Sequence, residues 1–162
     1  MELAFINLLN FLTVAPNLVP EVFQKPSVGN PIAVSLGAIA GALSRYYLSI
    51  WIAQAFGTGF PYATIVVNLT GSFLMGLVTT LILERILLIS PEISLFIAVG
   101  FLGSYTTFSS YELDAMNLVR EFNWSTPMTP SLAVKPIAYW LGSAVGGFFC
   151  LYLGIVVAKM VK

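Results

Sequence analysis

Glycines and hydroxyl-bearing residues gather in a tract from Gly100 to Tyr111, inside a segment that is otherwise hydrophobic enough to cross a membrane. In hydrocarbon every backbone N–H and C=O must be bonded within the protein, so helix-weakening residues are tolerated only where they are buried or line a wet cavity. A helix that breaks at membrane depth exposes carbonyl oxygens, and such oxygens bind cations in other transport proteins. The tract therefore predicts a broken helix and a place where ions are handled.

Polar side chains also recur inside other apolar segments. One helix face in the second segment carries a polar or small residue at every fourth position: Thr64, Asn68, Ser72 and Gly76. Asn68 lies well inside this segment, where its amide either joins two helices, contributing about 1 kcal/mol, or faces a permeating ion. Phe108 with Tyr111, and Tyr139 with Ser143, share faces of the third and fourth segments. Aromatic pairs of this kind usually pack a core, but their convergence with Asn68 favours an ion path.

These side chains suit a small, strongly hydrated anion. Hydrogen-bond donors and the positive edges of aromatic rings can replace water around it, and no mid-membrane carboxylate repels it. A proton-coupled cation carrier needs an acidic group in the membrane, and the first apolar segment contains none. Glu112 and Asp114 follow the tract toward the membrane surface, where they mark the mouth of a pathway or the end of the helix.

The elements that position these residues follow from composition. Hydrophobic residues make up 58% of the chain, the mean hydropathy is +0.91, and only 7 basic and 7 acidic residues occur among 162. This is the composition of an integral, all-α membrane protein. Four segments approach the roughly 20 apolar residues that cross a bilayer, with the third interrupted at mid-membrane: about 31–56, 62–83, 93 to the acidic residues after the tract, and 136–158.

The remaining parts of the chain are short. Residues 31–158 form the predicted four-helix channel domain, and residues 159–162 form a short basic C-terminus. Residues 1–30 are predicted to be an interfacial or flexible extension, because their apolar run is too short to span and lacks a basic start. The chain has no histidine and one cysteine, Cys150, which excludes disulfide frameworks, Cys/His metal sites and a histidine base. Zero net charge gives no sign of a nucleic-acid partner, and no enzyme activity is implied.

Flanking charge bears on topology. With four spans both termini lie on one side of the membrane, and the basic residues are nearly balanced between the two sides. The terminal side has Lys25, Arg85, Lys159 and Lys162, and the other side has Arg120 and Lys135, with Arg45 close to it. Balanced charge predicts insertion in both orientations and an antiparallel homodimer, although on charge alone a noisy bias in one short sequence is an equally good explanation. The small-residue pairs Gly37/Gly41 and Gly142/Gly146 indicate close helix crossings within or between chains.

Four motifs in order resemble the Fluc (CrcB) family of fluoride channels. They are Gly41-Ala-Leu-Ser-Arg-Tyr46, Asn68-Leu-Thr-Gly-Ser-Phe73, the tract from Gly100 to Tyr111, and Tyr139 with Ser143. The resemblance covers about Pro31 to Ala158. It implies a multi-pass protein of the bacterial inner membrane, an antiparallel dimer of four-helix subunits, and two pores through which cytoplasmic fluoride leaves passively.

The resemblance also implies roles for individual residues. Main-chain carbonyls of Gly103 and Thr106 match those that hold a structural Na⁺ on the dimer axis. The implied fluoride pathway comprises Asn68, Phe108, Ser110, Tyr111, Tyr139 and Ser143, and Arg45 is implied to serve a vestibule or a lipid-facing anchor. Tyr111 stands where the family usually has phenylalanine, and Glu112-Leu113-Asp114 stands where it often has Ser-x-Glu.

Two other classes of protein fit part of the pattern. A small dual-topology multidrug carrier has the same size and number of spans, but the missing acid in the first helix argues against it. A structural subunit of a membrane complex explains the small-residue faces but leaves the broken third helix unexplained. The expected partners are therefore fluoride, a second copy of the chain and membrane lipid.

Overall fold

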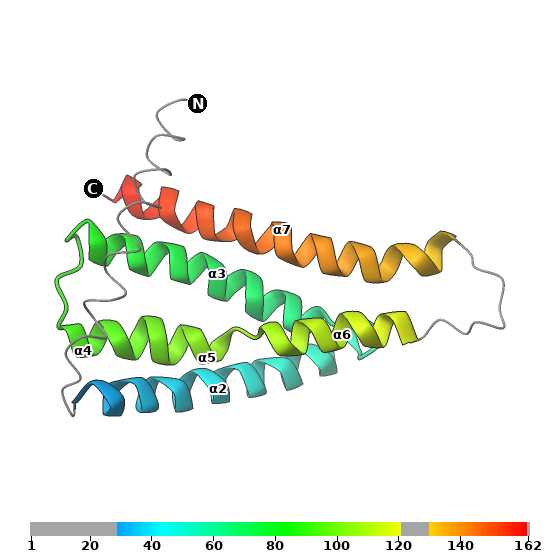
Figure 1. Ribbon diagram of the computed structural model, residues 1–162, viewed down its shortest axis with the longest axis horizontal. Helices are drawn as coiled ribbons and strands as arrows, with labels where there is room; N and C mark the ends of the chain where they lie inside the picture. The colour runs from blue at the N-terminus through cyan, green and yellow to red at the C-terminus, as the bar shows by residue number, and fades with distance from the viewer. Residues whose placement is uncertain (1–28, 121–129, 162) are drawn as a thin grey trace.

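The structure is a computed structural model that describes residues 29–120 and 130–161, and every regular element in these ranges is helical (Figure 1). Four helical segments are long and apolar enough to cross a membrane. They are α2 (Gly29–Phe56), α3 (Tyr62–Leu83), a composite segment from Pro91 to Arg120, and α7 (Pro130–Met160), whose apolar part begins at Val134. The predicted all-α fold with four spans is confirmed. Residues 1–28 of the predicted N-terminal extension and Lys162 of the basic C-terminus lie outside the described residues.

The third span is interrupted as predicted. It runs through α4 (Pro91–Ser94), a π-helix η1 (Leu95–Leu102), one further turn α5 (Gly103–Tyr105) and, after a gap, α6 (Phe108–Arg120). The break occupies only Thr106 and Thr107, and Thr106 is extended with a ψ of 157°. Most of the glycine-rich tract is therefore helical, and the interruption is narrower than the composition of the tract suggested.

Helix boundaries differ from the predictions at one place. α2 begins two residues before Pro31, and α3 has the predicted bounds. α7 begins at Pro130, so Pro136 lies buried inside the helix and does not open it. A proline inside a helix removes a single N–H donor, and here the surrounding apolar residues continue the helix on both sides of it. The predicted start of the fourth span at about Pro136 lies close to Val134, where the apolar part of α7 begins, whereas the helix itself already begins at Pro130.

Glycines let the helices approach closely in two pairs. A Cβ on Gly37 would lie 2.2 Å from the Phe96 carbonyl, and one on Gly41 would lie 2.2 Å from the Phe101 carbonyl, so α2 touches η1 backbone to backbone. α3 and α7 meet in the same way at Gly76 and Gly154. The predicted close crossing at Gly37 and Gly41 is thus formed within the chain.

The second predicted pair behaves differently. A Cβ on Gly142 would have no neighbour within 4 Å, and one on Gly146 would meet only the Leu69 side chain, at 3.1 Å.

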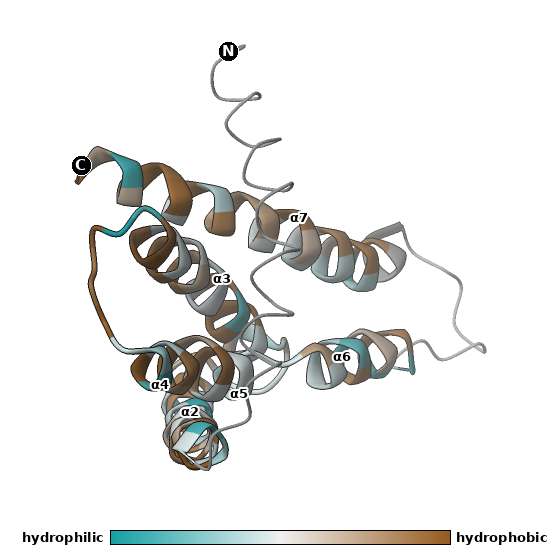
Figure 2. Ribbon diagram, turned by 60° about the vertical axis from the view of Figure 1, so that its left-hand side comes forward, coloured by the Kyte–Doolittle hydropathy of each residue, from teal (hydrophilic) through white to brown (hydrophobic). Residues whose placement is uncertain are grey.

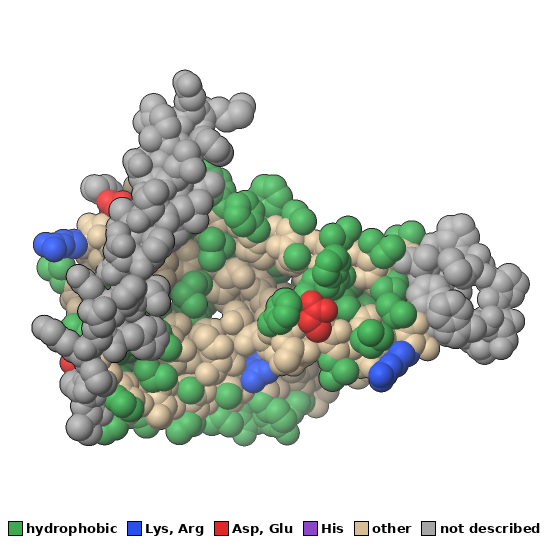
Figure 3. All heavy atoms as spheres, viewed as in Figure 1, with side chains coloured by type: hydrophobic (Ala, Val, Ile, Leu, Met, Phe, Trp, Pro, Cys, Tyr) green, Lys and Arg blue, Asp and Glu red, His purple; other side chains and the backbone are tan. Residues whose placement is uncertain are grey.

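The helices are largely apolar (Figure 2), and charged side chains are few on the face seen in Figure 3. α2 and α7 alone expose many large apolar side chains, including Leu36, Ile39, Leu43, Tyr47, Trp51, Leu141, Val145, Phe148 and Leu153. Lipid or another chain must cover these surfaces.

Candidate ion pathway

The break in the third span is held by Asn68 from α3. The Nδ2 group of Asn68 donates to the carbonyl of Thr107 at 3.0 Å, and the N–H of Thr107 donates to Oδ1 of Asn68 at 2.8 Å. One amide therefore satisfies both backbone groups of Thr107, which lies between the two helices, as burial in hydrocarbon requires. Asn68 does join two helices, and it does so at the site of the break.

Thr107 also begins the next helix. Its Oγ1 accepts from the N–H of Ser110 at 3.2 Å and donates to Oγ of Ser110 at 3.0 Å, which makes it the N-cap of α6. On the other side, Oγ1 of Thr106 donates to the Leu102 carbonyl at 3.0 Å and closes the end of α5. Thr107 was not among the predicted site residues, although threonine is one of the residues favoured at the N-cap of a helix.

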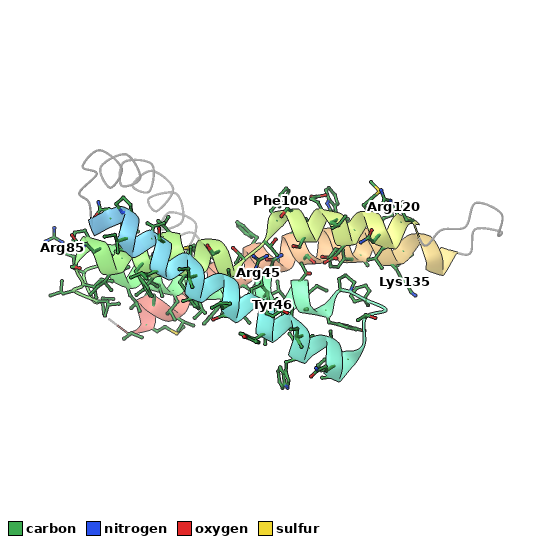
Figure 4. All side chains as sticks on the ribbon, turned by 90° about the horizontal axis from the view of Figure 1, so that it is seen from below. Arg45, Tyr46, Arg85, Phe108, Arg120 and Lys135 are labelled. Carbon is green, nitrogen blue, oxygen red and sulfur yellow. The ribbon has the colours of Figure 1, made fainter. Side chains whose placement is uncertain are left out.

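A cavity of about 360 Å³ lies between α2, α3 and the break, and we call it the arginine cavity. Its lining is Ala42, Arg45, Tyr46, Ser49, Thr64, Val67, Thr107 and Ser110. The Nε of Arg45 is buried and has no hydrogen-bond partner among the described residues. Figure 4 shows Arg45 beside the break. A guanidinium and several hydroxyl groups facing one space form a site suited to an anion.

Two further cavities share walls with the first. The loop cavity, of about 320 Å³ beside the α2–α3 connection, has Ser49 and Thr64 in common with it and also contains Asp114. The asparagine cavity, of about 260 Å³ on the far side of the break, has Thr107 in common with it and contains Asn68, Ser72 and Phe108. The three cavities are neighbours that share lining residues around the break. Arg45 and Ser110 line the arginine cavity, and Asn68 and Phe108 line the asparagine cavity.

A hydroxyl cluster closes one side of the loop cavity. Oγ1 of Thr64 donates to Oδ2 of Asp114 at 2.5 Å, and the Tyr139 hydroxyl donates to the same oxygen at 3.4 Å. Tyr139 is only 1% exposed. Thr64 was predicted to lie on a polar helix face and Asp114 near the mouth of a pathway. The bond between them joins residues 50 positions apart, and no local sequence pattern predicts it.

The two aromatic residues of the predicted pathway have different surroundings. Tyr111 is 6% exposed in the core between α6 and α7, whereas Phe108 is 74% exposed. Their ring centroids are 5.7 Å apart, and the Tyr111 ring lies 5.5 Å from that of Tyr139. Figure 4 shows Phe108 projecting outward at the start of α6. A single subunit therefore encloses one of the two rings and leaves the other uncovered.

The remaining predicted residues lie apart from the cavities. Ser143 on α7 is buried, and its hydroxyl has no hydrogen-bond partner within the described ranges. Gly103 is exposed, with an ordinary helical φ of −63°, and a Cβ there would meet only the Ala98 carbonyl at 3.8 Å. The backbone at Gly103 thus does not by itself require glycine.

Four apolar spans, one of them broken beside cavities that contain polar side chains, define a small multi-pass membrane protein. A family model described as "CrcB-like protein, Camphor Resistance (CrcB)" matches residues 32–155. The chain therefore belongs to the CrcB family of fluoride channels, which are channels and not enzymes, and it is a multi-pass protein of the bacterial inner membrane.

Curated relatives agree with this assignment. The chain is 51% identical over 139 residues to the "Fluoride-specific ion channel FluC" of Trichormus variabilis, covering 86% of this chain and 95% of that protein. It is 49% identical over 135 residues to the protein of the same name from a Synechococcus species, covering 83% and 96%. The proteins from Synechocystis and Chloroflexus aurantiacus are 43% and 38% identical. The alignments cover nearly the full length of these relatives, so the similarity includes all four spans.

Proposed function

We propose that the chain forms a fluoride-selective channel through which cytoplasmic fluoride leaves passively. The observation that carries this proposal is the unpartnered Nε of Arg45, a residue that lines a cavity together with five hydroxyl-bearing residues at a break in a membrane helix. Hydrogen fluoride enters cells as a neutral molecule and dissociates inside, which traps the anion. A negative-inside potential then drives the anion outward, with about 2.3 kcal/mol per charge at 100 mV.

The working unit is an antiparallel homodimer with two pores. Phe108 is 74% exposed in one subunit, although it lines the asparagine cavity, so a second chain is needed to enclose that part of the pathway. Basic residues support insertion in both orientations, because Arg85 at one end opposes Arg120 and Lys135 at the other (Figure 4). Lys159 adds a further positive charge in the last turn of α7. Membrane lipid covers the outer apolar faces.

The residues at the break also fit a structural sodium ion. α5 ends at Tyr105, so the last carbonyls of that helix have no helical partner, and the exposed Gly103 leaves its own carbonyl open to a neighbouring chain. Carbonyl oxygens are suitable ligands for a hard cation. In the proposed dimer, the carbonyls of Gly103 and Thr106 from both chains hold one Na⁺, which supplies a fixed positive charge that binds the two breaks together.

Fluoride efflux from liposomes that contain only this protein tests the function. Vesicles loaded with potassium fluoride and given a potassium ionophore are expected to release fluoride rapidly, whereas vesicles loaded with chloride are expected to retain it. A fluoride-selective electrode measures the release of fluoride, and a chloride-selective electrode measures the release of chloride. Equal release of both anions, or none of either, would reject the proposal of a fluoride channel.

Arg45→Gln is expected to lower the fluoride efflux rate by about 10-fold to 100-fold, because it removes the positive charge from the arginine cavity and leaves a shorter, neutral polar side chain. The matched control is Arg120→Gln, which removes the same charge from an exposed position at the end of α6. Electrode traces of the two variants at equal protein density make the comparison. A control that lost as much efflux as Arg45→Gln would indicate a general charge effect and not a site.

A further inference from the structure

Tyr111 and its neighbour Glu112 both bond to Trp140 on α7. The Tyr111 hydroxyl donates to the main-chain carbonyl of Trp140 at 2.6 Å. The indole Nε1 of Trp140 donates in turn to Oε1 of Glu112 at 3.2 Å. Two consecutive residues of α6 are thus tied to the backbone and the side chain of a single residue on α7. We call this set of three residues the Trp140 clamp.

The first bond restricts what Tyr111 can offer an anion. A phenolic hydroxyl has one hydrogen to donate, and in this structure the Trp140 carbonyl receives it. Among the described residues, the phenol that lies beside the Tyr111 ring is that of Tyr139, and it donates to Asp114. The hydroxyl lone pairs that remain would repel an anion. Only the ring edge of Tyr111 is therefore suited to contact fluoride.

The second bond keeps Trp140 in place. Trp140 is 47% exposed, so packing alone does not enclose its indole ring. Glu112 lies beside Tyr111 in sequence and holds the indole N–H from the same helix that carries the Tyr111 ring. The bond from the Tyr111 hydroxyl to the Trp140 carbonyl and the bond from the Trp140 indole to the Glu112 carboxylate together resist sliding or rotation of α6 against α7. Such a motion would turn the ring edge of Tyr111.

We propose that Tyr111 and Glu112 are positioning residues of the fluoride pathway: through Trp140 they hold the α6–α7 pair so that the Tyr111 ring edge, and not its hydroxyl, faces the anion. This assignment rests on the proposed fluoride function. It explains how a chain with tyrosine at this place can serve the same anion as one with phenylalanine, since the added hydroxyl is bonded to Trp140 and taken out of the path.

The test measures fluoride efflux from liposomes over a range of fluoride concentrations, for the whole protein and its variants. Trp140→Phe and Glu112→Ala each remove the second bond and are expected to lower the maximal rate by a similar factor of about 3. The double variant is expected to lose no more than either single variant. Glu112→Gln keeps an accepting oxygen and is expected to retain the original rate. Glu92→Ala at the start of α4 is the matched control for losing a carboxylate.

Variants at Tyr111 separate the ring from the hydroxyl. Tyr111→Phe is expected to lose no more than about threefold in maximal rate, with the same half-saturating fluoride concentration, because no ligand of the anion is removed. Tyr111→Ile is expected to lose at least about tenfold, because the positive ring edge is removed. A higher half-saturating concentration in Tyr111→Phe would show that the hydroxyl binds fluoride and would overturn the proposal.

A second measurement separates the clamp from the function. The unfolding midpoint of the purified protein in detergent is expected to fall equally in Trp140→Phe and Glu112→Ala and to fall no further in the double variant. If the original protein passes no fluoride while these midpoints are coupled in this way, the proposed function fails and the clamp stands. Additive effects on the midpoint and on the rate, in a protein that conducts fluoride, would overturn the clamp.

Discussion

Asn68→Asp is expected to lower the fluoride flux by at least about 100-fold. At an effective dielectric constant of 20, a full charge about 4 Å from the anion costs about 4 kcal/mol, and each 1.36 kcal/mol corresponds to a factor of ten in rate. The change also removes the Nδ2 donor that bonds the Thr107 carbonyl, and two oxygens then face each other across the break. Liposome efflux measures the loss, and size-exclusion chromatography shows whether the oligomer survives.

A neutral variant separates the two effects of this change. Asn68→Leu removes both hydrogen bonds to Thr107 without adding a charge. If Asn68 contacts fluoride, the aspartate variant loses much more flux than the leucine variant at a similar unfolding temperature. Equal losses in both, with a lowered unfolding temperature, would mean that Asn68 acts only by bonding the break.

Removal of sodium is expected to have the second large effect. With a large inert cation on both faces of the vesicle, fluoride efflux should fall by at least about tenfold and the dimer should dissociate more readily, since carbonyl oxygens would then face one another without a cation between them. Restored sodium should reverse both changes. If neither efflux nor dimer stability depends on sodium, the broken helix is only a packing feature and the ion has no part in the mechanism.

Substitutions at the break extend this experiment. Gly103→Leu is expected to weaken the dimer and its response to sodium, although the described subunit has room for a Cβ there and the φ of −63° suits any residue. The expected clash therefore comes from a second chain. Thr106→Ser keeps the carbonyl and the hydroxyl that bonds Leu102, so it should be tolerated. Gly59→Leu, which adds the same side chain at a place where a Cβ has no neighbour within 4 Å, is the control.

The sequence by itself determined the class of protein and the position of its spans. Hydrophobic runs must be about as long as the bilayer is thick, so the bounds of α3 could be predicted residue by residue, and α2 within two residues. The break was also predictable, because a run of glycines and hydroxyl residues at membrane depth needs special surroundings. The start of α7 was less predictable from hydrophobic length, because the helix extends beyond the apolar span to Pro130.

Only the tertiary structure decided what the polar residues contact. Periodicity placed Asn68 on a polar face, but its pairing with the backbone of Thr107, 39 positions away, depends on how α3 lies against the break. The bond from Tyr111 to Trp140 likewise joins residues 29 positions apart. The cavity that Arg45 lines is completed by hydroxyl-bearing residues of α3 and of the third span. Hydrophobic length is a property of each segment alone, whereas a hydrogen bond between segments depends on their distance and rotation, which the order of residues does not record.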